Sequence, residues 1–483
     1  MPDGTSCLLD CCDCKFSAHP VGFGLLGGRD VSMGKLFGTD GIRGVANTWP
    51  MTAEAALAVG RATAHICRQH EGRHRIVIGK DTRLSGYMIE NALASGILSM
   101  GVDVLFIGPL PTPGIARITL ALRADAGLAI TASHNPYDDN GIKFFRHDGY
   151  KLDDTIEQQI EQLVFSGDID SIRPTADDIG KAVRIDDALG RYVEFAKRSF
   201  PRGQTLEGLR IVVDCAHGAA YKSTPLTLRE LGAEVIAYGI QPDGKNINAG
   251  CGSMHPQYLC HKVRKHAAHI GIAHDGDADR VLLCDEKGEL VDGDDILAIS
   301  ALDFLKKGEL KENTLVGTVM TNSGLEAAIT AADGRLIRTD VGDKNVIDAM
   351  LKGGLNLGGE PSGHIVFGDH ATAGDGLVAA LQILRIMRDT GQPLSQLSQC
   401  WTRHPQILTN IVVKEKKPFA DLNGVMELVH EAEADLKETG GRLLLRYSGT
   451  EPKARLLLEG KDSAMLEQWS GKISEAIQSQ IGE

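Results

Sequence analysis

The sequence has no hydrophobic run long enough to cross a membrane. Its longest candidate, "VLFIGPLPTPGIA" (104–116), is shorter than the roughly 20 apolar residues of a membrane span and is broken by three prolines. The first 32 residues lack the basic start and the apolar run of a secretory signal. The formal net charge of −13 disfavours nucleic acid or an anionic membrane as the main partner. We therefore expect a cytoplasmic protein with no membrane and no nucleic-acid partner.

A recognisable cysteine pattern is also lacking. Four of the ten cysteines crowd the start of the chain, and their spacing, C-x₃-C-C-x-C, matches neither common zinc pattern. The others are scattered through a long chain, as is typical of reduced thiols in the cytoplasm. We therefore interpret residues 1–32 as a disordered N-terminal extension rather than as a metal or redox centre.

What the sequence does contain, from residue 33 onward, is an alternation of short apolar runs with helix-like segments. Runs such as "RIVIG" (75–79), "AGLAI" (126–130) and "LRIVVD" (209–214) are separated by helical patterns, which is typical of α/β domains. The last part differs, because two helix-like segments enclose two hairpin-like strands. We predict three successive α/β domains with mixed sheets and a smaller C-terminal α+β domain, with the boundaries 33–188, 189–285, 286–402 and 403–483.

Three aspartates alternate in the segment "HDGDADR" (274–280). In an extended loop Asp275, Asp277 and Asp279 would point the same way, and converging carboxylates are costly unless a cation neutralises them. Such oxygen ligands suit Mg²⁺, which keeps several waters and bridges to phosphate. A calcium-binding EF-hand is excluded, because Arg280 stands where that loop needs glycine and the flanks resemble strands. The segment predicts a divalent-metal site, against the alternative of a turn with solvated acids.

A serine stands in an unusual setting in "TASHNP" (131–136). It follows an apolar run, and Asn135 and Pro136 favour a turn, so we expect the Ser133 hydroxyl to be exposed at the end of a strand. No G-x-S-x-G elbow surrounds it, which argues against a serine hydrolase. Phosphoryl transfer needs mainly positioning and charge neutralisation. We predict that Ser133 carries a phosphoryl group beside the metal, with Lys143 of "NGIKF" nearby.

The segment "RYSGTEP" (446–452) has the composition of an anion-binding loop. Glycine lets backbone N–H groups approach an anion, hydroxyls donate, and an arginine fork grips phosphate. Arg455 follows nearby. A hairpin turn with polar surface residues is the alternative. If the first interpretation is right, this loop holds a second phosphate through Arg446, Ser448, Gly449 and Thr450.

Two further loops carry polar groups that suit a sugar phosphate. In "GGEPSGH" (358–364), Glu360, Ser362 and His364 lie on a glycine-rich segment suited to sugar hydroxyls or an amino group, although an ordinary turn is the alternative. In "FGTDGIRG" (37–44), Arg43 is suited to help bind phosphate, unless it is simply solvated. Together with the serine and the aspartates, these loops predict a single site.

The four segments "TASHNP", "DGDADR", "GEPSGH" and "RYSGTEP", in this order and at these separations, resemble the α-D-phosphohexomutase superfamily. The resemblance spans residue 33 to the C-terminus. The segments "FGTDGIRG", "TVMTNSGLE" (318–326) and "RTDVGDKNV" (338–346) are most similar to bacterial members that act on glucosamine phosphates.

The resemblance implies four domains around a central cleft, with one loop from each. It implies a phosphorylated Ser133 and one Mg²⁺ per subunit, held by that phosphate with Asp275, Asp277 and Asp279. The implied reaction converts glucosamine 6-phosphate to glucosamine 1-phosphate through a 1,6-bisphosphate, in UDP-N-acetylglucosamine biosynthesis. The implied partner is a small-molecule sugar phosphate, and a homodimer is left open. The catalytic residues carried over are Ser133, Arg43, His134 and Lys143, and the substrate-binding residues are Arg280, Lys344, Glu360, Ser362, His364, Arg446, Ser448, Gly449, Thr450 and Arg455.

The chain departs from this pattern at one place. Lys344 and Asn345 stand where relatives are expected to carry arginine and tyrosine, and lysine lacks the guanidinium fork. This leaves the contact from the third domain open, but not the reaction class. The alternatives are a phosphomannomutase/phosphoglucomutase and a non-catalytic sugar-phosphate-binding protein. The second would be expected to lack the serine or an aspartate, and this chain has all of them.

Overall fold

The structure is a computed structural model, and it describes residues 36–38, 40–68, 72–438, 440–448 and 452–482. The segment 1–32, interpreted above as disordered, lies outside the described residues. Short 3₁₀ helices supplement the main elements and comprise Asp168–Ile172, Ala176–Asp178, Ala219–Tyr221, Lys311–Asn313, Ser398–Cys400 and Phe419–Asp421.

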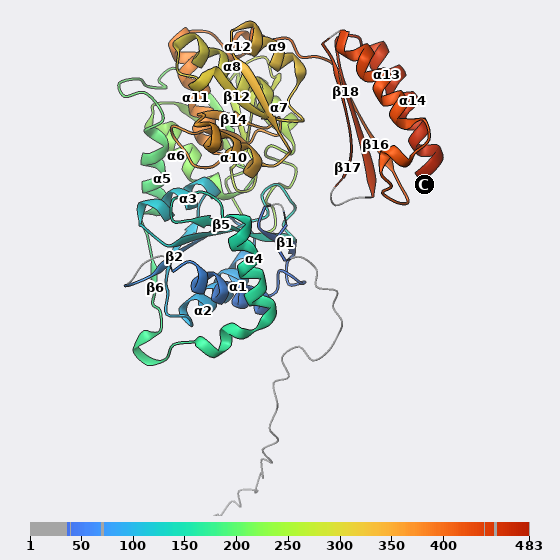
Figure 1. Cartoon of the computed structure of the whole chain (residues 1–483). Helices are drawn as coiled ribbons and strands as arrows, with labels where there is room; N and C mark the ends of the chain where they lie inside the picture. The colour runs from blue at the N-terminus through green and yellow to red at the C-terminus, as the bar shows by residue number, and fades with distance from the viewer. Residues whose placement is uncertain (1–35, 39, 69–71, 439, 449–451, 483) are drawn as a thin grey trace, which may run out of the picture. The chain divides into compact units, whose positions relative to one another are not determined.

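The first domain is built on a six-stranded mixed sheet of order β1-β5-β4-β2-β3-β6. Strands β2 and β4 lie inside the sheet, and their apolar residues are buried, as the continuous apolar runs predict. The strands are β1 (Ile42–Val45), β2 (Arg75–Lys80), β3 (Asp103–Pro109), β4 (Ala126–Ile130), β5 (Asp139–Arg146) and β6 (Ala182–Arg184). The helices are α1 (Ala53–Ile66), α2 (Gly86–Leu98), α3 (Thr112–Ala121) and α4 (Asp154–Ser166) (Figure 1).

The second domain has a five-stranded mixed sheet of order β11-β10-β9-β7-β8. Its strands are β7 (Arg210–Asp214), β8 (Glu234–Tyr238), β9 (Ile270–His274), β10 (Val281–Asp285) and β11 (Leu290–Val291). Helix α5 (Ala188–Lys197) precedes this sheet in the chain, and α6 (Ser223–Glu230) and α7 (Pro256–His266) connect its strands.

The third domain has a four-stranded mixed sheet of order β13-β12-β14-β15. Its strands are β12 (Thr314–Thr318), β13 (Arg335–Thr339), β14 (Leu357–Gly359) and β15 (Ile365–Phe367). Its helices are α8 (Gly293–Lys307), α9 (Ser323–Ala331), α10 (Asp343–Gly353), α11 (Gly376–Thr390) and α12 (Leu394–Leu397).

The same four-strand arrangement occurs in all three α/β domains. In each, three strands are parallel, the first lies between the second and the third, and a fourth strand joins antiparallel beside the third. The loop between the third and fourth strands therefore has an equivalent place in each domain. These loops are β4–β5, β9–β10 and β14–β15, and they carry Ser133, the three aspartates and Glu360. The prediction of three α/β domains with mixed sheets is confirmed.

The C-terminal domain is α+β, as predicted. An antiparallel sheet of order β16-β18-β17 packs with two helices around its own apolar core, which includes Leu456, Trp469 and Ile473. The elements are β16 (Gln406–Val412), α13 (Val425–Glu438), β17 (Arg442–Tyr447), β18 (Lys453–Glu459) and α14 (Ser463–Ile481). The central cleft stays a prediction.

The α/β domains share one continuous apolar core. Ile115, Ile211 and Leu357, from the first, second and third domains, belong to the same buried cluster. A buried polar contact crosses this core, because the Tyr192 hydroxyl on α5 donates to the Asp375 carboxylate at 2.9 Å. Asp375 caps α11 by accepting from the backbone N–H groups of Leu377 and Val378. The contact thus joins the helix between two domains to the third domain.

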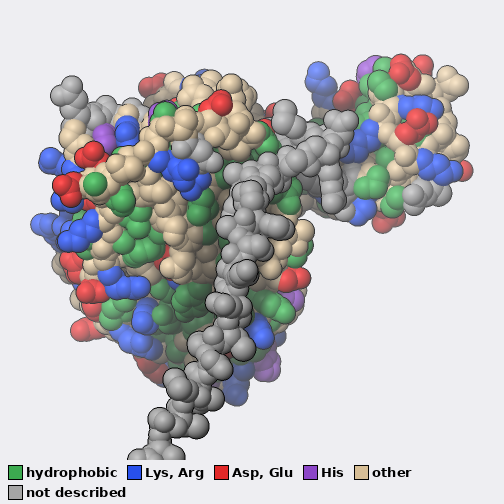
Figure 2. All heavy atoms as spheres, turned by 90° about the horizontal axis from the view of Figure 1, so that it is seen from below, with side chains coloured by type: hydrophobic (Ala, Val, Ile, Leu, Met, Phe, Trp, Pro, Cys, Tyr) green, Lys and Arg blue, Asp and Glu red, His purple; other side chains and the backbone are tan. Residues whose placement is uncertain are grey.

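The surface is mixed in charge, and hydrophobic side chains also reach it. On the face shown in Figure 2, Lys and Arg side chains lie among Asp and Glu side chains. Among the described residues, no helix combines the length and apolar character that crossing a membrane requires.

Removing the Tyr192 hydroxyl tests the buried contact. We expect Tyr192→Phe to lower the free energy of unfolding by about 1–3 kcal/mol, because a buried carboxylate loses a donor. Urea unfolding measures the change. The matched control is Tyr137→Phe, since the Tyr137 side chain is exposed. Equal unfolding midpoints for the two variants would contradict the role given to this contact.

Candidate active site

Three buried aspartates converge in the β9–β10 loop. Asp275, Asp277 and Asp279 each offer a carboxylate oxygen, and these oxygens lie within 4.8 Å of one another. The predicted convergence is present, but the extended loop was wrong. The segment is a tight turn, in which the Ala278 N–H donates to the Asp275 carbonyl at 3.2 Å and Ala278 has a φ of 57°. The turn, rather than alternation along a strand, brings the carboxylates together.

Lys143 supplies positive charge to this cluster. Its ammonium group lies 2.8 Å from Asp277 Oδ2 and 2.7 Å from Asp279 Oδ2. Burial by itself lowers the pKa of Lys143, but Asp277, Asp279 and Asp40 together raise it well above its ordinary value. The lysine is therefore charged, and it lies inside β5, ten residues after Ser133 in the sequence.

The cluster still holds more negative charge than the lysine neutralises. Burial raises the pKa of Asp275, and Asp279 and Asp277 raise it further. Among the described residues, the buried Oδ1 atoms of Asp277 and Asp279 have no hydrogen-bond partner. Carboxylate oxygens that lie within 4.8 Å of one another are the donor set of a hard divalent cation. The three aspartates therefore fit such a metal.

Ser133 lies directly beside the aspartates. Its Oγ donates to Asp275 Oδ2 at 2.5 Å, although 142 residues separate the two in the chain. The prediction of an exposed hydroxyl was wrong, because Ser133 is only 1% exposed. The aspartate loop covers it, and a Cβ added to Gly276 would stand 2.5 Å from the Ser133 carbonyl oxygen. The turn predicted at "TASHNP" is present, with the Asn135 N–H donating to the Ala132 carbonyl at 3.1 Å.

His134 is the other side chain near the serine hydroxyl. Its Nδ1 lies 3.4 Å from Ser133 Oγ. Burial lowers the pKa of His134 to about 4, with the nearby Arg280 and Arg43 acting in the same direction. The ring is therefore neutral at neutral pH, and it adds no positive charge to the serine.

A second set of charges extends the site toward the third domain. Arg43 Nη2 donates to Asp40 Oδ2 at 2.5 Å, and Lys151 Nζ donates to the other oxygen of Asp40, Oδ1, also at 2.5 Å. Lys151 also pairs with Asp343 at the start of α10. His364 Nε2 lies 3.5 Å from Asp343 Oδ2, and its Nδ1 lies 3.8 Å from Asp279 Oδ1. Residues of all three α/β domains thus share one network.

Sequence analysis missed four members of this network. Asp40 lies inside "FGTDGIRG" and Asp343 precedes Lys344. Both acids could therefore have been predicted from their position in segments already assigned to the site. Lys151 had no local signal. Thr112, at the start of α3, donates its hydroxyl to Asp277 Oδ2 at 2.7 Å, and only the fold reveals that contact.

The β14–β15 loop presents Glu360 near the same network. Glu360 Oε1 accepts from the Gly342 N–H at 2.9 Å, and the Ser362 hydroxyl lies 3.5 Å from its Oε2. Burial lowers the pKa of His364, but Asp279 and Asp343 raise it above its ordinary value. Arg280 Nε lies 4.0 Å from Asp279 Oδ1. His364 and Arg280 therefore lie beside Asp279, and Glu360 is close enough to both to raise their pKa values.

Lys344 has a different neighbourhood. Its ammonium group pairs with Asp154 on α4, so that it links the third domain to the first. The Lys344 ammonium group is therefore already paired. A sugar phosphate that bound Lys344 would have to compete with the Asp154 carboxylate.

The residues predicted to hold the second phosphate lie in the C-terminal domain. Arg446 on β17 is directly opposite Arg455 on β18, so both side chains stand on the same face of the sheet. Ser448 is buried, and its N–H closes the hairpin onto the Lys453 carbonyl at 2.9 Å. Gly449 and Thr450 lie outside the described residues. Two guanidinium groups directly opposite each other repel, and an anion bound between them would relieve that repulsion.

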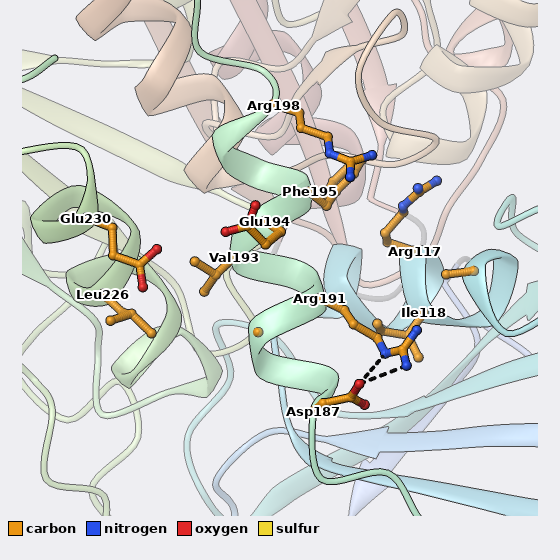
Figure 3. A pocket seen from close by; sticks show the side chains of 12 residues that line it. Arg117, Ile118, Asp187, Arg191, Val193, Glu194, Phe195, Arg198, Leu226 and Glu230 are labelled. Atoms are coloured by element: carbon orange, nitrogen blue, oxygen red, sulfur yellow. Dashed lines mark hydrogen bonds and ion pairs between the residues drawn. The ribbon is translucent and has the colours of Figure 1, made fainter. Parts of the chain in front are cut away.

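A separate pocket of about 510 Å³ contains none of the predicted residues. Figure 3 shows it beside α5, with Arg117 and Ile118 of α3 on one side and Leu226 and Glu230 of α6 on the other. Arg117 lies over the Phe195 ring at 4.8 Å, and Arg191 pairs with Asp187 at 2.8 Å. The pocket is lined by α3 of the first domain, by α6 of the second and by α5 between them, and no residue of the aspartate loop lines it.

Comparison with known protein families identifies the family to which this chain belongs. Models of the phosphoglucomutase/phosphomannomutase family match the chain in sequence, as α/β/α domains I, II and III and a C-terminal domain. The chain belongs to this family of phosphohexomutases. The matched residues are 34–170, 190–288, 292–404 and 408–476.

Curated relatives point to one member of the family. A phosphoglucosamine mutase of Geotalea daltonii is 57% identical over 450 residues, covering 93% of this chain and 99% of the relative. A phosphoglucosamine mutase of Myxococcus xanthus is 57% identical over 443 residues, covering 92% and 96%.

Solved structures show the same fold. A phosphoglucomutase/phosphomannomutase family protein of Burkholderia thailandensis has a TM-score of 0.76 at 25% identity, covering 93% of this chain and 99% of that one. The Aspergillus fumigatus N-acetylphosphoglucosamine mutase, solved with GlcNAc-6P and magnesium, has a TM-score of 0.64 at 17% identity, covering 92% and 95%.

Removing the Lys143 charge tests the charge balance of the aspartate cluster. We expect Lys143→Met to lower the free energy of unfolding by about 3–5 kcal/mol, because buried carboxylates lose their partner. A saturating divalent cation should recover part of this loss, since it replaces the missing charge. Chemical unfolding with a chelator, and then with magnesium, measures both effects.

The matched control is Lys151→Met. Lys151 is another lysine of the same network, but it contacts Asp40 and Asp343 rather than the three aspartates. Magnesium should therefore recover a smaller part of the loss in free energy of unfolding in Lys151→Met than in Lys143→Met. An equal recovery in the two variants would refute the metal assignment.

Proposed function

We propose that this chain is an enzyme that interconverts glucosamine 6-phosphate and glucosamine 1-phosphate, the phosphoglucosamine mutase reaction. The observation that carries the proposal is the Ser133 hydroxyl 2.5 Å from a carboxylate of a buried, metal-competent aspartate triad, within a family of phosphohexomutases. Relatives 55–58% identical over about 93% of the chain bear the name of this activity. The product is the aminosugar 1-phosphate that UDP-N-acetylglucosamine biosynthesis consumes.

The reaction needs a phosphoryl group stored on Ser133. The phosphoserine gives its phosphoryl group to the C1 hydroxyl of glucosamine 6-phosphate, and the Ser133 Oγ–P bond breaks. The resulting 1,6-bisphosphate turns over in the site. Ser133 Oγ then takes the phosphoryl group from C6, which leaves glucosamine 1-phosphate and restores the phosphoserine. A positioned carrier and neutralised charge are sufficient for such transfers.

Charge neutralisation comes from metal and protein together. Mg²⁺ is the cation we propose, with Asp275, Asp277, Asp279 and the Ser133 phosphate as ligands, and it would neutralise charge on the phosphoryl oxygens. Lys143 and Arg43 both lie near the aspartates, and neighbouring carboxylates raise the pKa of each. His134, being neutral, is suited to exchange a proton with a reacting hydroxyl.

The remaining residues are proposed to hold the sugar phosphate. Arg446 and Arg455, with Ser448, Gly449 and Thr450, would grip the phosphate that does not react, because a guanidinium pair suits a dianion. Glu360 Oε2 would accept from the protonated 2-amino group, with Ser362 and His364 beside it. Arg280 and Lys344 would complete the binding of the substrate.

Substrate preference is the direct test of the proposed function. A charge-assisted hydrogen bond to the amino group contributes ~1.5–3 kcal/mol, which corresponds to a preference of about tenfold to a hundredfold over glucose phosphate. Turnover of glucosamine, glucose and mannose phosphates should be measured side by side with the matching bisphosphate present. Glu360→Ala should reduce the preference for glucosamine phosphate over glucose phosphate. Equal or better kcat/KM for mannose phosphate would assign the chain to the other branch of the family.

The serine carrier has its own test. We expect Ser133→Ala to abolish turnover, because the variant lacks the hydroxyl that is proposed to store the phosphoryl group, and the Thr112 hydroxyl at the aspartates already donates to Asp277. Intact-mass measurement should find a phosphorylated fraction in the native protein and none in this variant. The control is Ser362→Ala, which removes an exposed hydroxyl from another loop of the site and should keep the phosphorylated fraction. Turnover by Ser133→Ala at the native rate would exclude the carrier role.

A further inference from the structure

The backbone of Ser133 is in a conformation that serine rarely adopts. Its φ of 52° lies in the left-handed region, which costs free energy for any residue that has a Cβ. Such a conformation persists only where its surroundings determine it. The contacts that hold this conformation therefore indicate how the Ser133 side chain is positioned.

Two side chains grip the same two carbonyl oxygens of this loop. Arg83 Nη2 donates to the Ser133 carbonyl at 3.1 Å and to the Asn135 carbonyl at 2.6 Å. Asn248 Nδ2 donates to the Ser133 carbonyl at 2.9 Å and to the Asn135 carbonyl at 3.0 Å. Four hydrogen bonds thus converge on the residue that carries the hydroxyl and on the residue two positions beyond it.

Arg83 holds the loop from within the first domain. It is fully buried and pairs with Asp81, which also accepts from the Thr131 hydroxyl at 2.7 Å. Thr131 Oγ1 in turn accepts from the Ser133 N–H at 3.0 Å. The loop is therefore held at its N–H and at its carbonyl by one closed set of buried groups.

Asn248 holds the loop from the second domain, which also carries the aspartates. Its backbone N–H donates to the Ala216 carbonyl at 2.9 Å, and its own φ of 59° lies in the left-handed region. A Cβ on Gly276, in the aspartate turn, would stand 3.0 Å from Asn248 Nδ2. Asn248 is thus in contact with the serine loop and the aspartate loop at the same place.

We infer that Arg83 and Asn248 form a positioning clamp that sets the register between the phosphoserine loop and the aspartate loop. The inference rests on the proposed function. Neither side chain contacts Ser133 Oγ in the structure, and the clamp acts through the carbonyl groups. Its loss should therefore misplace the phosphoryl group relative to the metal ligands without removing any group that binds the sugar. Phosphoryl transfer should slow, while substrate binding should be nearly unchanged.

Two substitutions of Asn248 test the clamp. Asn248→Gly removes the donor but keeps a residue that adopts a positive φ without strain. Asn248→Asp keeps the shape but presents an acceptor to the two carbonyl groups. Since small misplacements slow a reaction strongly, kcat should fall by about tenfold to a hundredfold, with KM within about twofold of the native value. Asn246→Ala is the matched control, because Asn246 lies in the same loop and its amide donates to the Gln241 carbonyl instead.

A second measurement does not depend on turnover. Hydrogen exchange of the backbone amides of residues 131–139 should become faster in both Asn248 variants and in Arg83→Lys, but not in Asn246→Ala. Native-like kcat in both Asn248 variants, or a lower kcat with unchanged exchange of this segment, would overturn the clamp. If the native protein turned over no hexose phosphate, the proposed function would fail, and the exchange measurement would still decide whether the clamp exists.

Discussion

Buried negative charge is the constraint on which the site depends. Five carboxylates, from Asp275, Asp277, Asp279, Asp40 and Asp343, lie close together and largely away from solvent. Such an arrangement is stable only if cations accompany it, and removing any one cation leaves a costly charge behind. Lys143, Lys151 and Arg43 supply that compensation from the first domain. These ion pairs therefore join residues of the three α/β domains at the site, in addition to the apolar core that the domains share.

The repeated strand arrangement explains how distant segments meet. In each α/β domain the functional loop leaves the third strand and returns as the antiparallel fourth strand, so it lies at the carboxyl end of a parallel strand, where ligands bind in open α/β sheets. Serine, aspartates and glutamate occupy this equivalent place in the first, second and third domains. Each loop contains one residue with a positive φ, namely Ser133, Ala278 and Gly363. A common scaffold thus presents three different chemical groups to one substrate.

Sequence reasoning recovered the parts of the site that are compact in the chain. Ser133 and the three aspartates were found because their neighbours restrict the backbone and because three acids in five residues are unusual. Strand order was not predictable, because it depends on pairing between strands that are distant in the sequence. The burial of Ser133 and the pairing of Lys344 with Asp154 were not predictable either, because both arise from contacts between domains. Asn248 and Arg83 were also missed, because an amide and a guanidinium that bind carbonyl groups have no local signature. The resemblance to a known family supplied the reaction, which residue types alone left open between several sugar phosphates.

The separation of the interacting residues along the chain has a consequence for synthesis. Ser133 meets Asp275 142 residues later, and Lys151 meets Asp343 192 residues later. At a translation rate of ~5–20 residues per second, the second interval lasts about 10–40 s. Until the aspartate loop is synthesised, the nascent first domain carries Lys143 and Lys151 with Asp40 but without the other acids that later pair with them. In a ribosome-bound intermediate of this protein, these lysines are therefore hydrated and incompletely neutralised. In the finished enzyme, carboxylates pair with them and water is largely excluded from them.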